Sequence, residues 1–215
     1  MTVFGIDVSH HQHGLSMSAV RRQGYEFVIA KASQGRTLRD PDFQRFRRGA
    51  KRAGLLFAAY HFLHSDSSAR SQADNLAAAL NDAPNVPIMI DCEPTEDSSP
   101  TMEDVEQFSS ACAELGLRVS ILYLPQFLWE VIGRPRLDMQ MIFMQALYGH
   151  NKRGTGSVIY PGDRSTRWNR MGGTKTGLLQ FGSRGRLDGF GGDVDVDAFR
   201  GGLGRLAASH AFLVP

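Results

Sequence analysis

The sequence predicts an α/β fold: a modified (β/α) TIM-like barrel with regular β/α units first and β-rich, helix-poor units later. Two observations support this prediction. Short apolar runs alternate with helix-like segments over the first 146 residues, which is typical of a parallel sheet buried on both faces. Polar side chains also recur where successive runs end. An open sheet fits the alternation too, but a barrel brings all of those ends to one mouth and is favoured.

The predicted strands are apolar segments bounded by turn residues or by charged side chains. The first six are residues 2–8, 25–32, 55–62, 86–90, 117–124 and 139–146. Two shorter apolar segments, 178–181 and 194–196, follow without a helix-length segment between them. The later part of the barrel is therefore expected to be rich in strands.

Helices are predicted between these strands from apolar residues at helical spacing. They are residues 16–23, 41–53, 67–80, 101–115 and 126–132. Gly24, Gly54 and Gly116 follow three of these segments as stop signals. The fourth begins with T-M-E-D at 101–104, which fits a capping box.

Length and composition exclude several classes of protein. The chain has 215 residues, 42% of them hydrophobic, which excludes a disordered chain. We expect residues 1–215 to form a single barrel domain, with an irregular basic insertion at about 150–176 and a terminal helix at about 203–213. Two cysteines exclude a disulfide scaffold. No run of 18 apolar residues occurs, so no membrane insertion is expected.

The net charge of +2 hides an acidic block and a basic block. No Lys or Arg occurs at 71–117, whereas 134–175 carries eight basic residues and two acidic ones. Most of these charges are expected on solvated helix faces and loops, and the acidic block also holds a candidate carboxylate site. Because the total is near neutral and the cations lie in one loop-rich stretch, no nucleic-acid binding is expected.

The segment PIMIDCEP at 87–94 carries the clearest chemical signal. Residues two apart in an extended chain point the same way, so Asp91 and Glu93 project together from the end of an apolar strand. Repulsion between them raises the pKa of one carboxyl and leaves it protonated near neutrality. Such a pair suits general acid catalysis with electrostatic support. The alternative is an exposed Asp91 that caps the next turn beside a solvated Glu93.

Further acids lie near other strand ends. Asp7 follows the first apolar run, with an N-cap role as the alternative. Asp193, Asp195 and Asp197 alternate in GGDVDVDAF and are expected to share one side of a strand. A calcium loop is the alternative there, although the spacing lacks the glycine and the terminal glutamate of an EF-hand. Several carboxyls at strand ends together suggest a glycosidase.

Other polar residues at predicted strand ends are candidates for substrate binding. They are Lys31, Tyr60, His61, Tyr123 and Tyr148. The ends of barrel strands converge on one mouth, so these side chains are expected to surround the same substrate. We expect His61 to act as a hydrogen-bonding group there and not as a metal ligand.

Other catalytic classes lack a motif. His10, His11 and His13 lie close together, but no HExxH or other full ligand set accompanies them, so no metal is expected. The chain has no GxSxG and no glycine-rich phosphate loop, so neither a serine nucleophile nor a cofactor is expected. Cys92 has acidic neighbours, which raise a thiol pKa, and a buried thiol on the opposite side of the strand is the better interpretation.

Six segments occur in order between Phe4 and about Phe199: FGIDVSHHQ, YEFVIAKASQG, DPDF, AGLLFAAYHF, PIMIDCEP and LLQFGSRGRLDGFGGDVDVDAF. With a D-x-E after an apolar strand, this series resembles the family 25 glycoside hydrolases, the lysozymes of many phage lysins, bacteria and fungi. The resemblance implies a modified β/α barrel. It also implies cleavage of the β-1,4 bond between N-acetylmuramic acid and N-acetylglucosamine in peptidoglycan.

The resemblance implies roles for individual residues. Glu93, the second acid of D-x-E, matches the general acid, and Asp91 matches its partner. Asp7 matches the acid of the first strand, and Asp195 matches the acid of the family's VD-x-N-x-F ending. The residues that fall where the family lines its sugar groove are Tyr60, Tyr123 and Gln180. Retaining, inverting and substrate-assisted mechanisms all stay open.

Two segments depart from the family pattern. The aromatic W-x-A-x-Y of the sixth unit is M-Q-A-L-Y at 144–148, and Trp168 is a candidate replacement for the lost ring. The usual W-Q-Y-T is L-Q-F-G at 179–182. These losses motivate an alternative, an inactive carbohydrate-binding or structural barrel of the same fold, although the retained acids argue against it. A chitinase-like glycosidase ranks last, because D-V-D-V-D lacks a closing Glu.

The resemblance also implies partners and a place of action. Peptidoglycan glycan strands are the expected partner of a monomeric enzyme, and anionic cell-wall polymers are a second partner for the basic insertion. The side chains expected to attract such polymers are Arg153, Arg164, Arg167 and Arg170. No secretory signal is visible at residues 1–5, so we expect release from the host cytoplasm by a phage lysis system.

Overall fold

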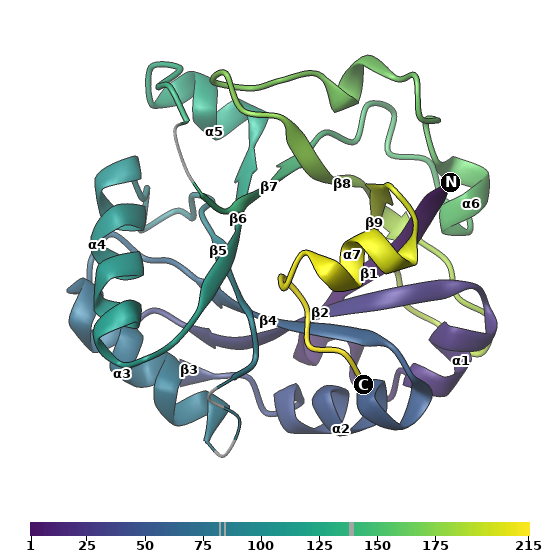
Figure 1. Cartoon of the computed structure of the whole chain (residues 1–215), viewed down its shortest axis with the longest axis horizontal. Coiled ribbons are helices and arrows are strands. Elements are labelled where there is room, and N and C mark those ends of the chain that lie inside the picture. The colour runs from purple at the N-terminus through teal and green to yellow at the C-terminus, as the bar shows by residue number, and fades with distance from the viewer. Residues whose placement is uncertain (82, 84, 138–139) are drawn as a thin grey trace.

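The computed structural model describes residues 1–81, 83, 85–137 and 140–215, and its strands form a closed barrel (Figure 1). The strands are β1 Thr2–Val8, β2 Tyr25–Gln34, β3 Leu38–Arg39, β4 Leu56–Phe62, β5 Ile88–Asp91, β6 Val119–Pro125, β7 Ile142–Ala146, β8 Thr176–Gly185 and β9 Val194–Arg200. Their order is β1-β9-β8-β7-β6-β5-β4-β2-β3, and a further pairing of β1 with β2 closes the wall. Short β3 pairs only at the edge of β2. The predicted barrel is therefore confirmed.

Strand β9 is what makes this barrel a modified one. It runs antiparallel to both of its neighbours, β1 and β8, whereas the other neighbouring strands of the wall are parallel. Residues 186–193 connect β8 to β9 without a helix, because antiparallel strands need only a short link while parallel strands need a crossover. The predicted loss of helices in the later units is confirmed.

Helices surround the wall of the barrel (Figure 1). They are α1 Met17–Arg22, α2 Phe43–Ala53, α3 Ala69–Leu80, α4 Met102–Glu114, α5 Gln126–Val131, α6 Gly156–Ile159 and α7 Leu203–Ala208, with 3-10 turns η1 His10–Gln12 and η2 Thr166–Trp168. The predicted capping box is present at α4, where Thr101 accepts from the backbone N–H of Asp104 and the Asp104 carboxylate accepts from that of Thr101. Gly54 ends α2 in the left-handed region at φ 69°.

Several predicted boundaries differ from the structure. Strands β8 and β9, predicted at 178–181 and 194–196, extend over Thr176–Gly185 and Val194–Arg200. The helix predicted at 203–213 stops at Ala208, because His210 takes a positive φ of 57° and Leu213 pairs with Phe57 of β4. The apolar residues that suggested a longer helix serve instead to close the barrel. The strand predicted at 139–146 begins at Ile142, and its predicted first residue, Met139, lies outside the described residues.

The barrel interior is filled at one end and hollow at the other. Phe212 packs its ring edge-on against Phe27, with centroids 5.1 Å apart, and α7 lies across this end (Figure 1). The ring of Phe27 also covers Gly5, where an added Cβ would lie 2.2 Å from the ring. Gly5 is therefore needed for close packing. The opposite end, where the parallel strands finish, is left for the polar side chains.

Candidate active site

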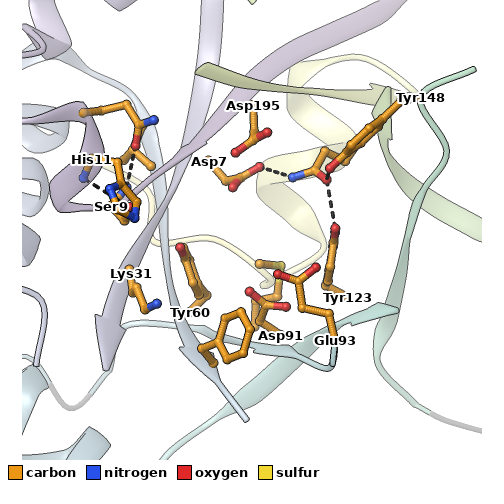
Figure 2. A pocket seen from close by; sticks show the side chains of 15 residues that line it. Asp7, Ser9, His11, Lys31, Tyr60, Asp91, Glu93, Tyr123, Tyr148 and Asp195 are labelled. Carbon is orange, nitrogen blue, oxygen red and sulfur yellow. Dashed lines mark hydrogen bonds between the residues drawn. The ribbon is translucent and has the colours of Figure 1, made fainter. Parts of the chain in front are cut away.

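A pocket of about 240 Å³ opens at the carboxyl end of the parallel strands (Figure 2). Its lining residues are Asp7, Val8, Ser9, His11, Gln12, Lys31, Tyr60, Phe62, Met89, Asp91, Glu93, Tyr123, Tyr148, Gln180 and Asp195. Nine of the ten predicted site residues are among them, and His61 is not. Side chains from eight different segments of the chain thus meet at one mouth, as the barrel topology requires.

The acids of the pocket come from three strands. Asp91 is the last residue of β5 and only 7% exposed, and Glu93 follows it two positions later. Asp7 of β1 lies opposite Asp195 in the antiparallel pairing with β9. Strand alternation points all four side chains inward, and Figure 2 shows the carboxyl groups facing a common space. The structure thus brings the four predicted acids together in one pocket.

The amide of Gln180 connects three sides of the pocket. Its Nε2 donates to Oδ2 of Asp7 at 2.6 Å, and its Oε1 accepts from the Tyr123 hydroxyl at 3.0 Å (Figure 2). The hydroxyl of Tyr148 donates to the same oxygen. These bonds leave the amide one orientation, because its N–H₂ must face the carboxylate and its oxygen must face the two phenols. Asp7 is thereby held in place.

The environment of Asp91 and Glu93 favours their protonated forms. Burial raises the pKa of Asp91 well above its usual range, and the charges of Glu93 and Asp7 raise it further. Burial also raises the pKa of Glu93, while Lys31 and a hydrogen bond with Tyr123 act in the opposite direction. Oδ1 of Asp91 is buried without a hydrogen-bond partner among the described residues. A buried carboxyl of this kind can hold a proton near neutrality.

The other two acids of the pocket behave in the same way. Burial, followed by the charge of Asp7, raises the pKa of Asp195 to about 8. Burial raises the pKa of Asp7, and the hydrogen bond from Gln180 lowers it. Four carboxyls with raised pKa values thus lie close together, and repulsion between their charges favours a mixture of protonated and ionised groups. That arrangement permits one group to donate a proton while a neighbour stabilises developing positive charge.

Lys31 supplies the positive charge of the pocket. It is the one Lys or Arg among the described residues that line it, and its ammonium lies 4.8 Å from the centre of the Phe62 ring. Burial lowers the pKa of Lys31, while the charges of Asp91, Asp40 and Glu93 raise it. The ammonium therefore partly offsets the repulsion among the acids.

His61 does not line the pocket, contrary to the prediction. It follows Tyr60 in β4, so its side chain points to the opposite face of the strand. The imidazole is fully buried, bonded to Ser33 at 2.8 Å and to Gln72 at 3.1 Å, and stacked on Phe108. Burial lowers its pKa to about 4. His61 thus joins the wall to the surrounding helices.

The residues that differ from the family's aromatic positions do not line the pocket. Met144 is fully buried inside the barrel, so it offers no surface to a sugar. Trp168 is also buried, donates to the Tyr160 hydroxyl and does not line the pocket, so it does not replace the lost ring. Leu179 and Phe181 flank Gln180 and pack in the outer core. The changes in L-Q-F-G therefore leave the polar floor of the pocket intact.

Several lining residues were missed by the sequence analysis. Tyr60 and Phe62 share one face of β4, and Met89 shares the face of Asp91, so strand alternation alone would have found Phe62 and Met89. The loop residues are Ser9, His11 and Gln12. They had no comparable signal, because the turn η1 that aims them is irregular.

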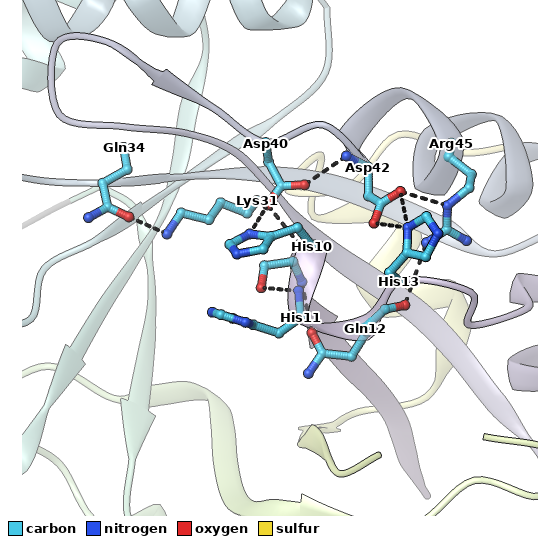
Figure 3. A network of polar contacts seen from close by, with 10 residues as sticks. His10, His11, Gln12, His13, Lys31, Gln34, Asp40, Asp42 and Arg45 are labelled. Atoms are coloured by element: carbon cyan, nitrogen blue, oxygen red, sulfur yellow. Dashed lines mark hydrogen bonds and ion pairs between the residues drawn. The ribbon is translucent and has the colours of Figure 1, made fainter. Parts of the chain in front are cut away.

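His10 and His13 are paired with acids, and the thiol of Cys92 is free and buried. Nδ1 of His10 lies 3.0 Å from Asp40, and Nδ1 of His13 lies 2.9 Å from Asp42 (Figure 3). Within the described ranges, no group of three His, Cys, Asp or Glu residues is placed to hold a metal ion. Cys92 is buried with a free thiol, which confirms its predicted placement. None of the described helices is long and apolar enough to cross a membrane.

A mixed β/α barrel with carboxyl groups gathered at its mouth defines the class of protein as a glycoside hydrolase. The chain belongs to glycosyl hydrolases family 25, whose model matches residues 6–155. It is 28% identical over 221 residues to lysozyme M1 of Streptomyces globisporus, covering 96% of this chain and 70% of that protein. It is 24% identical over 207 residues to the autolytic lysozyme of Clostridium acetobutylicum, covering 93% of this chain and 56% of that protein.

A solved structure shows the same fold. The bacterial lysozyme from Streptomyces coelicolor superposes with a TM-score of 0.77 at 24% identity, covering 97% of each chain. The fold predicted from strand alternation is therefore also that of this bacterial lysozyme.

Proposed function

We propose that this protein is a peptidoglycan muramidase, which hydrolyses the β-1,4 bond between N-acetylmuramic acid and N-acetylglucosamine. The observation that carries the proposal is the pairing of Asp91 and Glu93 at one strand end, facing Asp7 and Asp195 across the pocket. The similarity to two proteins named lysozymes supports this choice of substrate. No cofactor is needed for a reaction that carboxyl groups and water can perform.

Glu93 is the proposed general acid. It is partly exposed at the mouth, where a glycosidic oxygen can reach it, and burial raises its pKa, which favours the protonated form that a general acid needs. Proton transfer from Glu93 to the glycosidic oxygen breaks the C–O bond and leaves an oxocarbenium-like sugar. Ionised carboxylate among Asp91, Asp7 and Asp195 stabilises that positive charge.

The remaining polar groups are proposed to bind the sugar. Tyr60, Tyr123 and Tyr148 present phenols, and Lys31 presents an ammonium, to the same pocket. These donors suit the hydroxyl and acetamido oxygens of an amino sugar. Gln180 is proposed to act by holding Asp7, because its amide is already bonded to the carboxylate and to two phenols.

We also propose the partners of the enzyme and its route to the cell wall. The proposed enzyme is a monomer that acts on peptidoglycan glycan strands. Arg153, Arg164 and Arg170 are exposed on the basic insertion, and Arg167 is half-buried there, which supports attraction to anionic wall polymers. The resemblance to phage lysins supports release by a phage lysis system as the route to the wall.

Product analysis tests the proposal. Purified cell walls are digested, the new reducing ends are reduced with borohydride, and the modified sugar is identified after acid hydrolysis. A muramidase produces reduced muramic acid, whereas a glucosaminidase produces reduced glucosamine. Wall binding without any new reducing end would contradict the proposal and favour an inactive carbohydrate-binding barrel.

A further inference from the structure

Asp197 is a buried acid that the proposed reaction does not use. It lies on β9, two residues after Asp195, and has no exposed surface. Both of its carboxylate oxygens are buried without a donor, and among the buried carboxyl groups of the described residues no other lacks a partner at both oxygens. Leaving such a group ionised and unpartnered in the protein interior costs far more than burying a neutral polar group, and a buried carboxyl usually takes up a proton instead. Asp197 therefore needs a proton, a partner or both.

Among the described residues, Asp7 is a suitable partner for Asp197. Its register neighbours are Gly5 of β1, which has no side chain, and Gln180 of β8. The Gln180 amide is committed to Asp7 and to the two phenols. The carboxyl of Asp7, one layer nearer the mouth, lies within hydrogen-bonding reach of Asp197.

Two ionised carboxylates cannot hydrogen bond to each other, because both are acceptors only. Contact between Asp7 and Asp197 therefore requires one proton between them. Asp7 already accepts a donor from Gln180, whereas Asp197 accepts none. The proton consequently belongs on Asp197, where it turns an unsatisfied acceptor into a donor aimed at Asp7.

We propose that Asp197 is a positioning residue: a protonated carboxylic acid beneath the pocket that donates to Asp7 and keeps Asp7 ionised and oriented. The catalytic part of this inference rests on the proposed function, in which Asp7 contributes negative charge. The protonation of Asp197 itself does not depend on any activity.

Two further observations support the inference. Burial and the charge of Asp195 raise the pKa of Asp197 well above its usual range, and they outweigh the lowering effect of its contact with Asp7. The other titratable groups that sense its charge are Asp7 on β1 and Tyr25 on β2, and no described Lys or Arg affects its pKa.

Stability as a function of pH tests the protonation without substrate. As pH rises above about 4, the unfolded chain releases the Asp197 proton while the folded chain keeps it, so the wild type loses stability. The Asp197→Asn variant has no such proton. We therefore expect the Tm of the variant, relative to that of the wild type, to rise between about pH 4 and pH 7. The expected rise is about 3–5 °C for each pH unit by which folding raises the pKa of Asp197.

Asp193→Asn is the matched control for this measurement. Hydrogen bonds from Arg153 and Arg186 lower the pKa of Asp193, so its removal should cost stability as pH rises, the opposite trend. If Asp197→Asn does not fold, the assigned ¹³C carboxyl signal of Asp197 in the wild type gives the answer. A protonated signal at neutral pH supports the inference, and an ionised one overturns it.

The positioning role is tested by the pH dependence of kcat/KM on cell walls. Asp197→Ala removes the donor to Asp7, so the pKa of Asp7 rises and the acid limb should move up by about one pH unit. Asp197→Asn restores a donor and should bring the limb back toward the wild type. Equal activity losses in both variants, with unchanged limbs, would overturn the positioning role. If the wild type proves inactive, the stability measurement still decides the protonation state.

Discussion

Gln180 Nε2 lies 2.6 Å from Oδ2 of Asp7, and this hydrogen bond links the floor of the pocket to its acid on β1. The other end of the same amide accepts from Tyr123. Because the amide cannot flip without losing these bonds, Asp7 always faces a donor at this position. The result is an acid whose orientation is set before substrate arrives, which is what electrostatic stabilisation of a transition state requires.

We expect Gln180→Leu to lower kcat/KM on cell walls by about tenfold to hundredfold, the effect of about 1–3 kcal/mol for a lost hydrogen bond to a buried acid. The variant leaves Asp7 without its donor and two phenols without their acceptor. The measurement is a progress curve of new reducing ends, with the Tm of both proteins as a control for folding. A fully active Gln180→Leu would show that Asp7 needs no support from β8.

Lys31→Met should shift the pH dependence of the enzyme upward. The ammonium of Lys31 lowers the pKa of both Asp91 and Glu93, so its removal raises both values. Ionised Asp91 then appears only at higher pH, and Glu93 keeps its proton to higher pH. Both limbs of the kcat/KM profile should therefore move in the alkaline direction. If the maximum of kcat/KM falls while both apparent pKa values of the profile stay unchanged, Lys31 contributes to substrate binding and not to the pKa values of the acids.

His61→Leu should weaken the fold more than it weakens substrate binding. The change leaves Ser33 and Gln72 without their partner and removes a ring stacked on Phe108, at a cost of about 1–3 kcal/mol. For a chain of this length, Tm should fall by about 2–4 °C per kcal/mol. KM for cell walls should stay within about threefold of the wild-type value. A large rise in KM at unchanged Tm would place His61 back among the substrate-binding residues.

Charge reversal in the basic insertion should weaken attachment to walls. Arg164 and Arg170 are exposed there, and each Arg→Glu change removes one attraction to an anionic polymer and adds one repulsion. Arg52→Glu, on exposed surface of α2, is the matched control. The fraction of protein that sediments with walls should fall for the first two variants only, and also as salt is raised. Salt-independent sedimentation would contradict the electrostatic model.

Strand alternation explains why most of the site could be predicted. Once Asp91 is placed at a strand end, Glu93 follows by parity, and the same rule brings Asp7 and Asp195 inward. The error at His61 has the same origin, because Tyr60 and His61 are adjacent and only one of them can face the mouth. The segment Y-H-F at 60–62 alone does not determine whether Tyr60 or His61 faces the pocket.

Depth in the barrel could not be predicted. The alternation of D-V-D-V-D correctly places Asp195 and Asp197 on one side, yet one lines the pocket and the other is fully buried. Asp193 lies just before β9 and pairs with Arg153 and Arg186 instead. The closing tail was mistaken for a longer helix for a related reason: its apolar residues contact the barrel end, a tertiary contact that periodicity does not report.

The rate of new reducing ends made from purified walls by the wild type and by Glu93→Gln tests the central claim most directly. Gln keeps the shape of Glu93 and cannot donate a proton as an acid, so the rate should fall by about a hundredfold to ten-thousandfold. Glu96→Gln, on an exposed residue nearby, should retain the wild-type rate. Glu93→Gln activity within tenfold of the wild type, with folding intact, would contradict the assignment of Glu93 as the general acid.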